Sequence, residues 1–412
     1  MVWLDDRARA QERRFGASFG AERIHAISGK PLDVIPCLYR VIWLQENEPE
    51  LLDGAARIAE VHGYLVFRLT GRWMTSTASA DPTGMIDMTR LDWSGDILAA
   101  AGIARDKLPD LVAPSGFIGE VTQTAAAATG LALGTPVFAG GGDGQCAGTG
   151  VAALQPGCAY INLGTAVVAG TYSAKYGYDP AFRTEIAIAD GGYIFETCVR
   201  SGTFLLDWLA GEMFGIEPAR KAEALARLEG EAAASPVGAG GVVLLPYWQG
   251  CMTPHWDSAA RGIIAGLSGS TKKGDIYRAI LEGIALDQGH AAARAASVIG
   301  TPVEQYVAIG GGAASDLWLQ ILADATNRPI SRSNANEASS LGAAMAAAKG
   351  AGWFPSLAEA SVTMASPIAR TFEPDPKRAA LYSELLDIYN DLWPALSSWN
   401  RRLVDFIESR AG

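Results

Sequence analysis

Apolar residues recur at helical spacing in many segments of the chain. Within residues 55–69, Ile58, Val61, Leu65 and Leu69 follow one another at intervals of three or four positions. This spacing places the four side chains on one face of a helix. The same pattern, bounded by glycine, proline or small polar residues, predicts the other helices. Helices are expected at residues 39–47, 55–69, 97–103, 123–130, 203–214, 218–234, 275–300, 315–327, 339–349 and 377–408, the last with a kink or break at Pro394.

Short apolar runs between these segments predict buried strands. Beyond residue 165 such runs become frequent, and the pattern is rich in strands. Residues 75–92 and 247–269 are dominated by turn-forming residues and are predicted to be loops. Strands are expected at residues 136–139, 159–163, 167–171, 184–189, 193–199, 242–246 and 306–309.

Two of the expected strands end in three consecutive glycines. Residues 136–139 run into Gly140–Gly142 and then Asp143, and residues 306–309 run into Gly310–Gly312. Glycine has no Cβ, so the backbone can approach a ligand closely there. A lone carboxylate on such a turn suggests one group that does chemistry beside a backbone that cradles an anion. Two facing domains would bring both turns to one ligand, whereas the alternative is two ordinary α/β turns.

The composition is that of a globular protein and excludes several classes of partner. With 412 residues, 49% hydrophobic and 19% charged, the chain has room for two or three domains with a real core. A net charge of −11 argues against nucleic acid or an anionic membrane as partner. No stretch approaches the roughly 20 apolar residues of a membrane span. Five scattered cysteines without C-x-x-C spacing predict reduced thiols in the cytoplasm, and four histidines lack zinc-ligand spacing.

Several common catalytic motifs are absent. No Walker A sequence occurs, and residues 266–273 lack its order. The spacing Gly142-x-Gly144-x-x-x-Gly148 is one residue too long for a dinucleotide-binding turn. No G-x-S-x-G elbow and no Ser-His-Asp set are present. A P-loop enzyme, a dehydrogenase and a serine hydrolase are therefore disfavoured.

The order of several short motifs resembles the FGGY family of carbohydrate kinases, and within it the xylulokinases. Residues 3–7, Trp-Leu-Asp-Asp-Arg, are similar to the W-x-D-x-R segment beside the sugar. Gly-Gly-Asp at 141–143 resembles the catalytic aspartate turn, and Leu-Gly-Thr at 163–165 a phosphate loop. Residues 310–320 resemble the adenosine motif. Further similar segments are residues 43–50, 69–71, the loop around Asp81, Gly202 ahead of Trp208, residues 261–267, 277–283 and 337–344.

This resemblance implies an α/β fold of two actin-like (ribonuclease H-like) domains around a cleft. The expected limits are 1–156 for the sugar-side domain, 157–350 for the nucleotide-side domain and 351–412 for a C-terminal helical segment. The implied reaction is transfer of the γ-phosphoryl group of ATP, with Mg²⁺, to a hydroxyl of a sugar. The resemblance to xylulokinases implies that this sugar is a pentulose such as D-xylulose. The resemblance further implies a cytoplasmic enzyme, without nucleic-acid or membrane partners, and it allows a homodimer.

The resemblance also implies roles for individual residues. Asp143 would accept the proton of the attacking hydroxyl, as a general base does. The metal ligands stay unassigned. Residues expected to bind the sugar are Trp3, Asp5, Arg7, Asp143, Gly144 and Gln145. Residues expected to bind ATP are Gly164, Thr165, Gly202, Gly311, Gly312, Ser315 and Asp316.

Two features depart from the family pattern. FGGY kinases begin with a strand, an Asp-x-Gly-Thr phosphate loop and about 75 further residues, far more than an ordinary loop, and none of these precedes Trp3. That aspartate is the family's usual metal anchor. We therefore expect an N-terminally truncated first domain, and a catalytically impaired relic that binds nucleotide or sugar is the alternative to an active kinase. Xylulokinases usually place Asn after the catalytic Asp, whereas Gly144 and Gln145 follow here, which leaves the sugar open.

Overall fold

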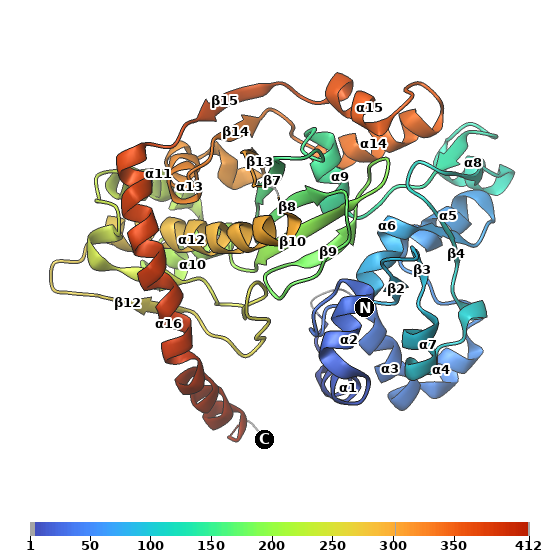
Figure 1. Cartoon of the computed structure of the whole chain (residues 1–412), viewed down its shortest axis with the longest axis horizontal. Coiled ribbons are helices and arrows are strands. Elements are labelled where there is room, and N and C mark those ends of the chain that lie inside the picture. Colours follow the sequence, from blue (N-terminus) through green and yellow to red (C-terminus); the bar gives the residue numbers. More distant parts are fainter. Residues whose placement is uncertain (1–4, 301, 411–412) are drawn as a thin grey trace.

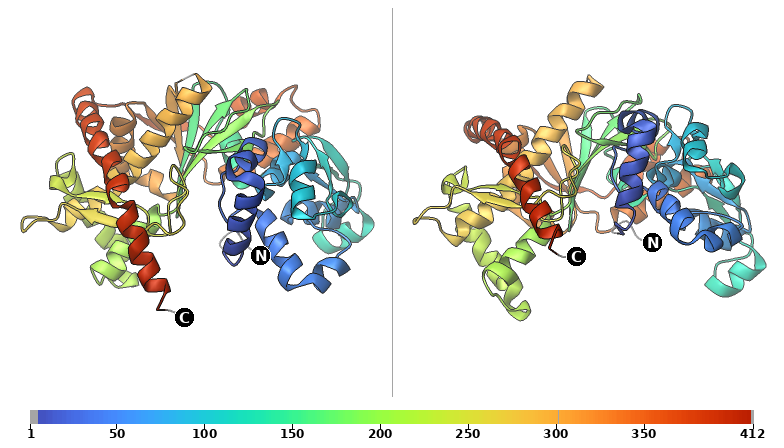
Figure 2. Two further views of the ribbon diagram at one scale, coloured as in Figure 1. Left: turned by 60° about the horizontal axis from the view of Figure 1, so that its bottom comes forward. Right: turned by 90° about the horizontal axis from the view of Figure 1, so that it is seen from below.

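The computed structural model describes residues 5–300 and 302–410. Figure 1 shows two parts side by side: a part built around a large sheet, and an N-terminal part of short helices and small sheets. The two further views in Figure 2 show the same division. Trp3, one of the expected sugar contacts, lies outside the described residues.

A mixed sheet of seven strands forms the centre of the larger part. The strands stand in the order β15 (Ile368–Phe372), β14 (Ile330–Ser333), β13 (Gln305–Ile309), β7 (Cys158–Leu163), β8 (Val167–Ser173), β10 (Tyr193–Val199) and β9 (Arg183–Ile186). β7, β8, β10 and β9 form successive antiparallel pairs, whereas β13 lies parallel to β7 and to β14. Ile309 of β13 pairs with Asn162 of β7, so both strands end at the same edge of the sheet.

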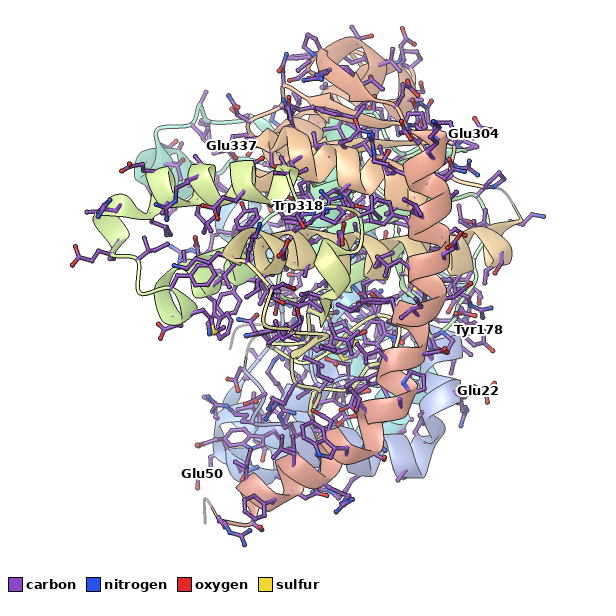
Figure 3. All side chains as sticks on the ribbon, turned by 90° about the vertical axis from the view of Figure 1, so that its left-hand side faces the viewer. Glu22, Glu50, Tyr178, Glu304, Trp318 and Glu337 are labelled. Carbon is purple, nitrogen blue, oxygen red and sulfur yellow. The ribbon has the colours of Figure 1, made fainter. Side chains whose placement is uncertain are left out.

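Helices cover both faces of this sheet. On one face lie α10 (Thr203–Trp208), η4 (Leu209–Met213), η5 (Pro218–Arg220), α11 (Lys221–Ala233), α12 (Lys273–Ile299) and α13 (Asp316–Thr326); on the other lie α9 (Asp143–Gly150) and α14 (Ala338–Gly350). Because alternate side chains of a strand point to opposite faces, Ile161 and Leu163 pack with the first layer and Tyr160 with the second. Trp318 of α13 is fully buried in the first layer, and Figure 3 shows it inside the body.

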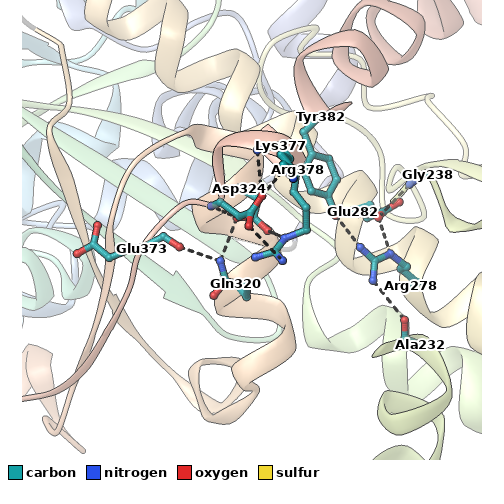
Figure 4. A network of polar contacts seen from close by, with 11 residues as sticks. Ala232, Gly238, Arg278, Glu282, Gln320, Asp324, Glu373, Lys377, Arg378 and Tyr382 are labelled. Atoms are coloured by element: carbon teal, nitrogen blue, oxygen red, sulfur yellow. Dashed lines mark hydrogen bonds and ion pairs between the residues drawn. The ribbon is translucent and has the colours of Figure 1, made fainter. Parts of the chain in front are cut away.

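The long helix α16 (Pro376–Glu408) lies across the first layer and is held by polar contacts at its start (Figure 4). Arg378 Nε donates to Asp324 Oδ2 at 2.5 Å. The Tyr382 hydroxyl donates to Glu282 Oε1 at 2.8 Å. Both carboxylates are buried, so displacement of α16 would take the arginine from Asp324 and a hydroxyl donor from Glu282, which is costly.

The N-terminal part contains only short elements among its described residues. Its helices are α1 (Arg9–Phe15), η1 (Gly16–Gly20), α2 (Ala21–Ser28), α3 (Cys37–Asn47), α4 (Pro49–Gly54), α5 (Val61–Thr70), α6 (Thr77–Ala80), η2 (Asp81–Thr83), α7 (Gly95–Ala101), η3 (Arg105–Lys107) and α8 (Gln123–Thr129). Its strands form three two-stranded sheets: β1 (Met74–Ser76) with β4 (Asp110–Val112), β2 (Ile86–Asp87) with β3 (Asp92–Trp93), and β5 (Phe117–Glu120) with β6 (Pro136–Phe138).

The N-terminal part covers the free edge of β9. Thr184 N donates to Gly29 O at 2.8 Å, and Ile186 N donates to a carboxylate oxygen of Asp81. An uncovered edge strand would expose unpaired backbone groups. The contacts therefore join the two parts through main-chain hydrogen bonds as well as side chains.

All seven expected strands and most expected helices are confirmed, including the strand at 242–246, observed as β11 (Val243–Leu245). Gly71 and Gly130, expected to end helices, adopt the left-handed conformation after α5 and α8, as Gly300 does after α12, whereas Gly350, also expected to close a helix, is the last residue of α14 itself. No described helix has both the length and the apolar character needed to cross a bilayer.

Several expectations were wrong. The helix expected from residue 55 begins only at Val61, because Glu60 caps it by accepting a hydrogen bond from Gly63 N at 2.7 Å. The expected loop 75–92 contains short helices and strands, and the loop 247–269 contains β12 (Ile263–Ala265). Of the kink or break expected at Pro394, the break does not occur, because α16 continues through this residue. Several elements were not anticipated. They are α1, α2, β14, α15 (Leu357–Met364), β15 and the short turns η6 (Ala239–Gly241) and η7 (Gly311–Ala314).

Candidate active site

Asp143 is the first residue of α9 and is exposed. Gly144 N donates to Asp143 Oδ1 at 2.9 Å, and Ser339 Oγ of α14 donates to the Asp143 carbonyl oxygen at 2.9 Å. A Cβ at Gly141 would overlap the Ile188 side chain, which explains the glycine ahead of the aspartate. The turn is thus tightly packed, while its carboxylate faces outward.

Small residues allow α9 and α14 to cross closely behind this turn. A Cβ at Gly342 would overlap the backbone of Cys146, and one at Gly150 would overlap the backbone of Ala338. The segment 337–344, one of those similar to the family, therefore packs directly on the helix that carries Asp143. This contact fixes the position of α9 on the sheet.

Gln145, an expected sugar contact, is buried. Its Nε2 donates to the carbonyl oxygen of Ala78 at 2.9 Å. The side chain therefore joins α9 to α6 in the N-terminal part. A contact of Gln145 with a sugar stays a prediction.

The structure brings three of the expected ATP-binding residues together. Gly202 N donates to Thr165 O at 2.7 Å, and Thr203 N donates to Gly164 O at 2.9 Å. A Cβ at Gly202 would lie 2.6 Å from the carbonyl oxygen of Gly164, so only glycine fits this approach. The result is a double backbone contact that holds the loop after β7 in place.

The second glycine turn lies beside this loop, because β13 and β7 end at the same edge. Gly310 has a φ of +86°, and its Cβ position is taken by the side chain of Asn162. A Cβ at Gly312 would lie 2.9 Å from Leu163 Cβ. Gly311 has open space around it.

The adjoining loop and turn present backbone donors. Within residues 5–300 and 302–410, no acceptor is bonded to the N–H groups of Thr165, Gly311 and Gly312. Gly311 begins η7, and the first N–H groups of a helix have no partner within it. Such groups suit the oxygens of a phosphate.

Ser315 and Asp316 have structural partners. Ser315 Oγ caps α13 by accepting from Trp318 N at 3.0 Å, and donates to Glu229 Oε1 at 2.5 Å. Asp316 pairs with Arg332 and with Arg370, each at 2.5 Å. The hydrogen bond from Arg332 lowers the pKa of Asp316. Direct contact of either residue with a nucleotide stays a prediction.

Asp5 and Arg7 form an ion pair on the N-terminal part. Arg7 Nε donates to Asp5 Oδ1 at 2.8 Å, and the guanidinium lies 4.9 Å from the ring centre of Trp43. The hydrogen bond from Arg7 lowers the pKa of Asp5. No hydrogen bond or ion pair joins this pair to the Asp143 turn within the described part of the chain.

The sequence did not reveal a buried ionic group below the Asp143 turn. Arg183 Nε lies 2.6 Å from Glu196 Oε1 and 3.2 Å from Glu185 Oε1. Nearby, Lys30 Nζ lies 3.2 Å from Asp81 Oδ1, both side chains fully enclosed. The available signal was the presence of charged residues inside the strands expected at 184–189 and 193–199, where a buried strand is normally apolar.

Comparison with known proteins gives consistent matches over nearly the whole chain. The FGGY family of carbohydrate kinases, N-terminal domain, matches residues 1–150, and its C-terminal domain matches residues 159–351. The chain is 32% identical to a xylulose kinase of Bacillus subtilis (strain 168), covering 98% of this chain and 80% of the relative. It is 29% identical to an autoinducer-2 kinase of Klebsiella pneumoniae, covering 90% of this chain and 70% of the relative.

Solved structures agree with the sequence comparisons. The ligand-bound xylulose kinase from Lactobacillus acidophilus superposes with a TM-score of 0.91 at 25% identity, covering 98% of this chain and 81% of that one. A gluconate kinase from the same organism gives a TM-score of 0.91 at 25% identity over 98% and 80%. The α/β fold of two actin-like domains is thereby confirmed. The expected truncation of the first domain is not supported, because the N-terminal family model matches from residue 1 onward.

Proposed function

The chain belongs to the FGGY family of carbohydrate kinases, and on that premise we propose that it transfers the γ-phosphoryl group of ATP to a hydroxyl of a pentulose such as D-xylulose. The observation that carries the proposal is the pairing of the Gly164–Thr165 loop with the Gly310–Gly312 turn at one sheet edge. The exposed carboxylate of Asp143 supplies the general base of the proposed reaction.

Phosphoryl transfer depends mainly on positioning and on stabilising charge. The N–H groups of Thr165, Gly311 and Gly312 bind phosphate oxygens of ATP. The contact of Gly202 with Thr165, at 2.7 Å, keeps the first of these loops in place before ATP arrives. A donor that is already oriented needs no rearrangement when the negative charge shifts during transfer.

Asp143 acts as the general base. One of its carboxylate oxygens is oriented by Gly144 N at 2.9 Å, and no described residue donates to the other. That second oxygen accepts the proton of the sugar hydroxyl as the hydroxyl attacks the γ-phosphorus. General base catalysis of this kind contributes typically 10²- to 10⁴-fold.

Mg²⁺ accompanies ATP in this proposal. The described residues contain no group of three or more His, Cys, Asp and Glu side chains placed to hold a metal ion. Mg²⁺ usually keeps several waters and binds one or two carboxylates plus substrate phosphates, so such a group is not needed. Asp5 and Asp316 are paired with arginines and Asp143 is the proposed base, so no carboxylate among the predicted site residues is assigned to the ion. The ion would neutralise charge on the phosphate oxygens.

The test is an assay of sugar-dependent ADP release by the purified chain with MgATP. D-xylulose, D-gluconate and autoinducer-2 are the acceptors to compare, because the relatives' names include all three. Turnover with D-xylulose that is lost in Asp143→Asn supports the proposal. Turnover only with another acceptor would show that the enzyme is a kinase of that acceptor and not of D-xylulose. No turnover with any acceptor, together with calorimetric binding of ATP or sugar, would favour the impaired relic instead.

Three expectations remain proposals for this chain. We keep the domain limits 1–156, 157–350 and 351–412, which limited proteolysis can check. A homodimer is checked by light scattering of the purified chain. A cytoplasmic location is supported by five free cysteines without a disulfide.

A further inference from the structure

Four residues form one row across four strands directly below the Asp143 turn. Tyr160 of β7 pairs with Gly170 of β8, Gly170 pairs with Glu196 of β10, and Glu196 pairs with Arg183 of β9. Tyr160 and Glu196 are 0% and 2% exposed. Side chains in one row of a sheet are neighbours, so these groups meet on the α9 face.

The glycine at position 170 allows the side chains of Tyr160 and Glu196 to lie close together. A Cβ at Gly170 would overlap the ring of Tyr160, so the ring lies over the glycine. The Tyr160 hydroxyl is buried and has no hydrogen-bond partner among the described residues. The missing side chain in β8 therefore brings the tyrosine and Glu196 under the same point of α9.

That point is Gly144, the residue after the proposed base. A Cβ at Gly144 would lie 3.0 Å from Glu196 Oε2 and 3.1 Å from the Tyr160 hydroxyl oxygen. The Gly144 N–H in turn donates to Asp143 Oδ1 at 2.9 Å. The glutamate carboxyl group and the tyrosine hydroxyl therefore lie under Gly144, in the space that a side chain there would need, and Gly144 is hydrogen-bonded directly to the Asp143 carboxylate.

Glu196 is held firmly from the other side. Its Oε1 accepts from Arg183 Nε at 2.6 Å, and the same guanidinium lies 3.2 Å from Glu185. Burial raises the pKa of Glu196 to about 8, although Arg183 acts against this rise and Glu185 adds to it. A buried carboxyl group is costly to keep even when a cation lies beside it.

We propose that Glu196 is a positioning residue of the active site. Anchored by Arg183, its carboxyl group supports the Asp143 turn from below at Gly144 and sets the direction of the Asp143 carboxylate. The kinetic part of this inference rests on the proposed function. The structural part, that Glu196 orders residues 140–146, stands without it.

The experiment compares Glu196→Gln with a matched control, Glu282→Gln. Glu282 is equally buried at 2% exposed and is paired with an arginine, Arg278, at 2.6 Å, but it lies under α16. For Glu196→Gln we expect kcat to fall by roughly 10- to 100-fold, as for a displaced catalytic group. The KM for ATP stays within about twofold, because the ATP loops lie on β7 and β13. Glu282→Gln keeps kcat within about twofold.

A second readout does not need activity. Hydrogen exchange of the amides in residues 140–146, measured on the unliganded chain, becomes faster in Glu196→Gln and not in Glu282→Gln. Unchanged kcat and unchanged exchange in Glu196→Gln would overturn the inference, as would an equal loss of kcat in both variants. If the wild-type chain phosphorylates no sugar, the proposed function fails, and the exchange rates alone decide the inference. If Glu196→Gln does not fold, Gly144→Ala tests the same contact from the side of the turn.

Discussion

The backbone N–H of Gly202 donates to the carbonyl oxygen of Thr165 at 2.7 Å, and a Cβ at residue 202 would lie 2.6 Å from the carbonyl oxygen of Gly164, which leaves no room for a side chain. We expect Gly202→Ala to push the loop of Gly164 and Thr165 away from the Gly310–Gly312 turn. The KM for ATP should rise about tenfold, equivalent to about 1.4 kcal/mol, with a smaller change in kcat. Steady-state kinetics with varied ATP measure both constants.

Gly211 provides the control for this substitution. It lies in η4, close to Gly202 in sequence, and a Cβ added there meets nothing within 4 Å. Gly211→Ala should therefore leave the KM for ATP within about twofold. Equal effects of the two alanines would show that the loss at residue 202 does not come from the Thr165 loop.

Asp143→Asn separates catalysis from folding. Because the aspartate side chain is exposed, we expect Tm to stay within about 2 °C of the wild type. The loss of the proton acceptor should lower kcat by roughly 10²- to 10⁴-fold. ATP binding, measured by calorimetry, should persist, since the phosphate donors lie elsewhere. A variant that retains more than about a tenth of kcat would exclude Asp143 as the general base.

The sequence was sufficient for the local features of the fold. Apart from β12, short apolar runs predicted every strand from 136–139 to 306–309, and glycines predicted the ends of α5 and α8. Both rest on interactions within a few residues. β15 escaped prediction because it is an exposed edge strand, where residues 368–371 need not be apolar. The start of α5 was misplaced because an acidic side chain, Glu60, supplies the cap.

The candidate site likewise contains features that the sequence revealed and contacts that it did not. The Asp143 turn and the turn after β13 could be identified because packing or backbone conformation requires glycine at Gly141, Gly310 and Gly312. The partners of Gln145, Ser315 and Asp316 could not, since a polar residue in a motif can equally bind a ligand, cap a helix or pair with a distant arginine. The row below Gly144 depends on strand register, which a single sequence does not reveal.

Gly144→Ala tests the contact between the turn and that row. The added Cβ would lie about 3 Å from Glu196 and from the Tyr160 hydroxyl, so either the turn or the row must shift. Alanine favours a helix over glycine by about 1 kcal/mol, so the variant should fold. We expect kcat to fall by roughly tenfold with little change in Tm.

Tyr160→Phe is the second substitution, to be combined with Gly144→Ala. It removes a buried hydroxyl without a partner among the described residues, which costs little or stabilises. In the double variant the phenyl ring leaves space for the new Cβ, so part of the lost kcat should return. The coupling in a double-mutant cycle measures this. Strictly additive effects would mean that the alanine does not act through the tyrosine.

A buried aspartate of α12 should make stability depend on pH. Asp287 Oδ1 accepts from the hydroxyls of Tyr247 and Tyr389 at 3.1 and 3.2 Å, while Oδ2 is buried without a partner among the described residues. Burial raises the pKa of Asp287 from its ordinary 3.8 to about 7. Between these values the folded chain binds more protons than the unfolded chain, so this group lowers stability as the pH rises from about 4 to 7.

Asp287→Asn removes that dependence and keeps an oxygen that can accept from both tyrosines. We therefore expect the Tm of the variant minus the Tm of the wild type to increase by at least about 2 °C from pH 5 to pH 8. Asp324→Asn is the control, because Asp324 is equally buried but is paired with Arg378 at 2.5 Å, and arginine stays charged over this range. Its loss should lower Tm by a similar amount at both pH values. If the Asp287→Asn difference is constant with pH, the carboxyl group is already ionised at pH 5, and the neighbouring hydroxyls stabilise its charge more than burial opposes it.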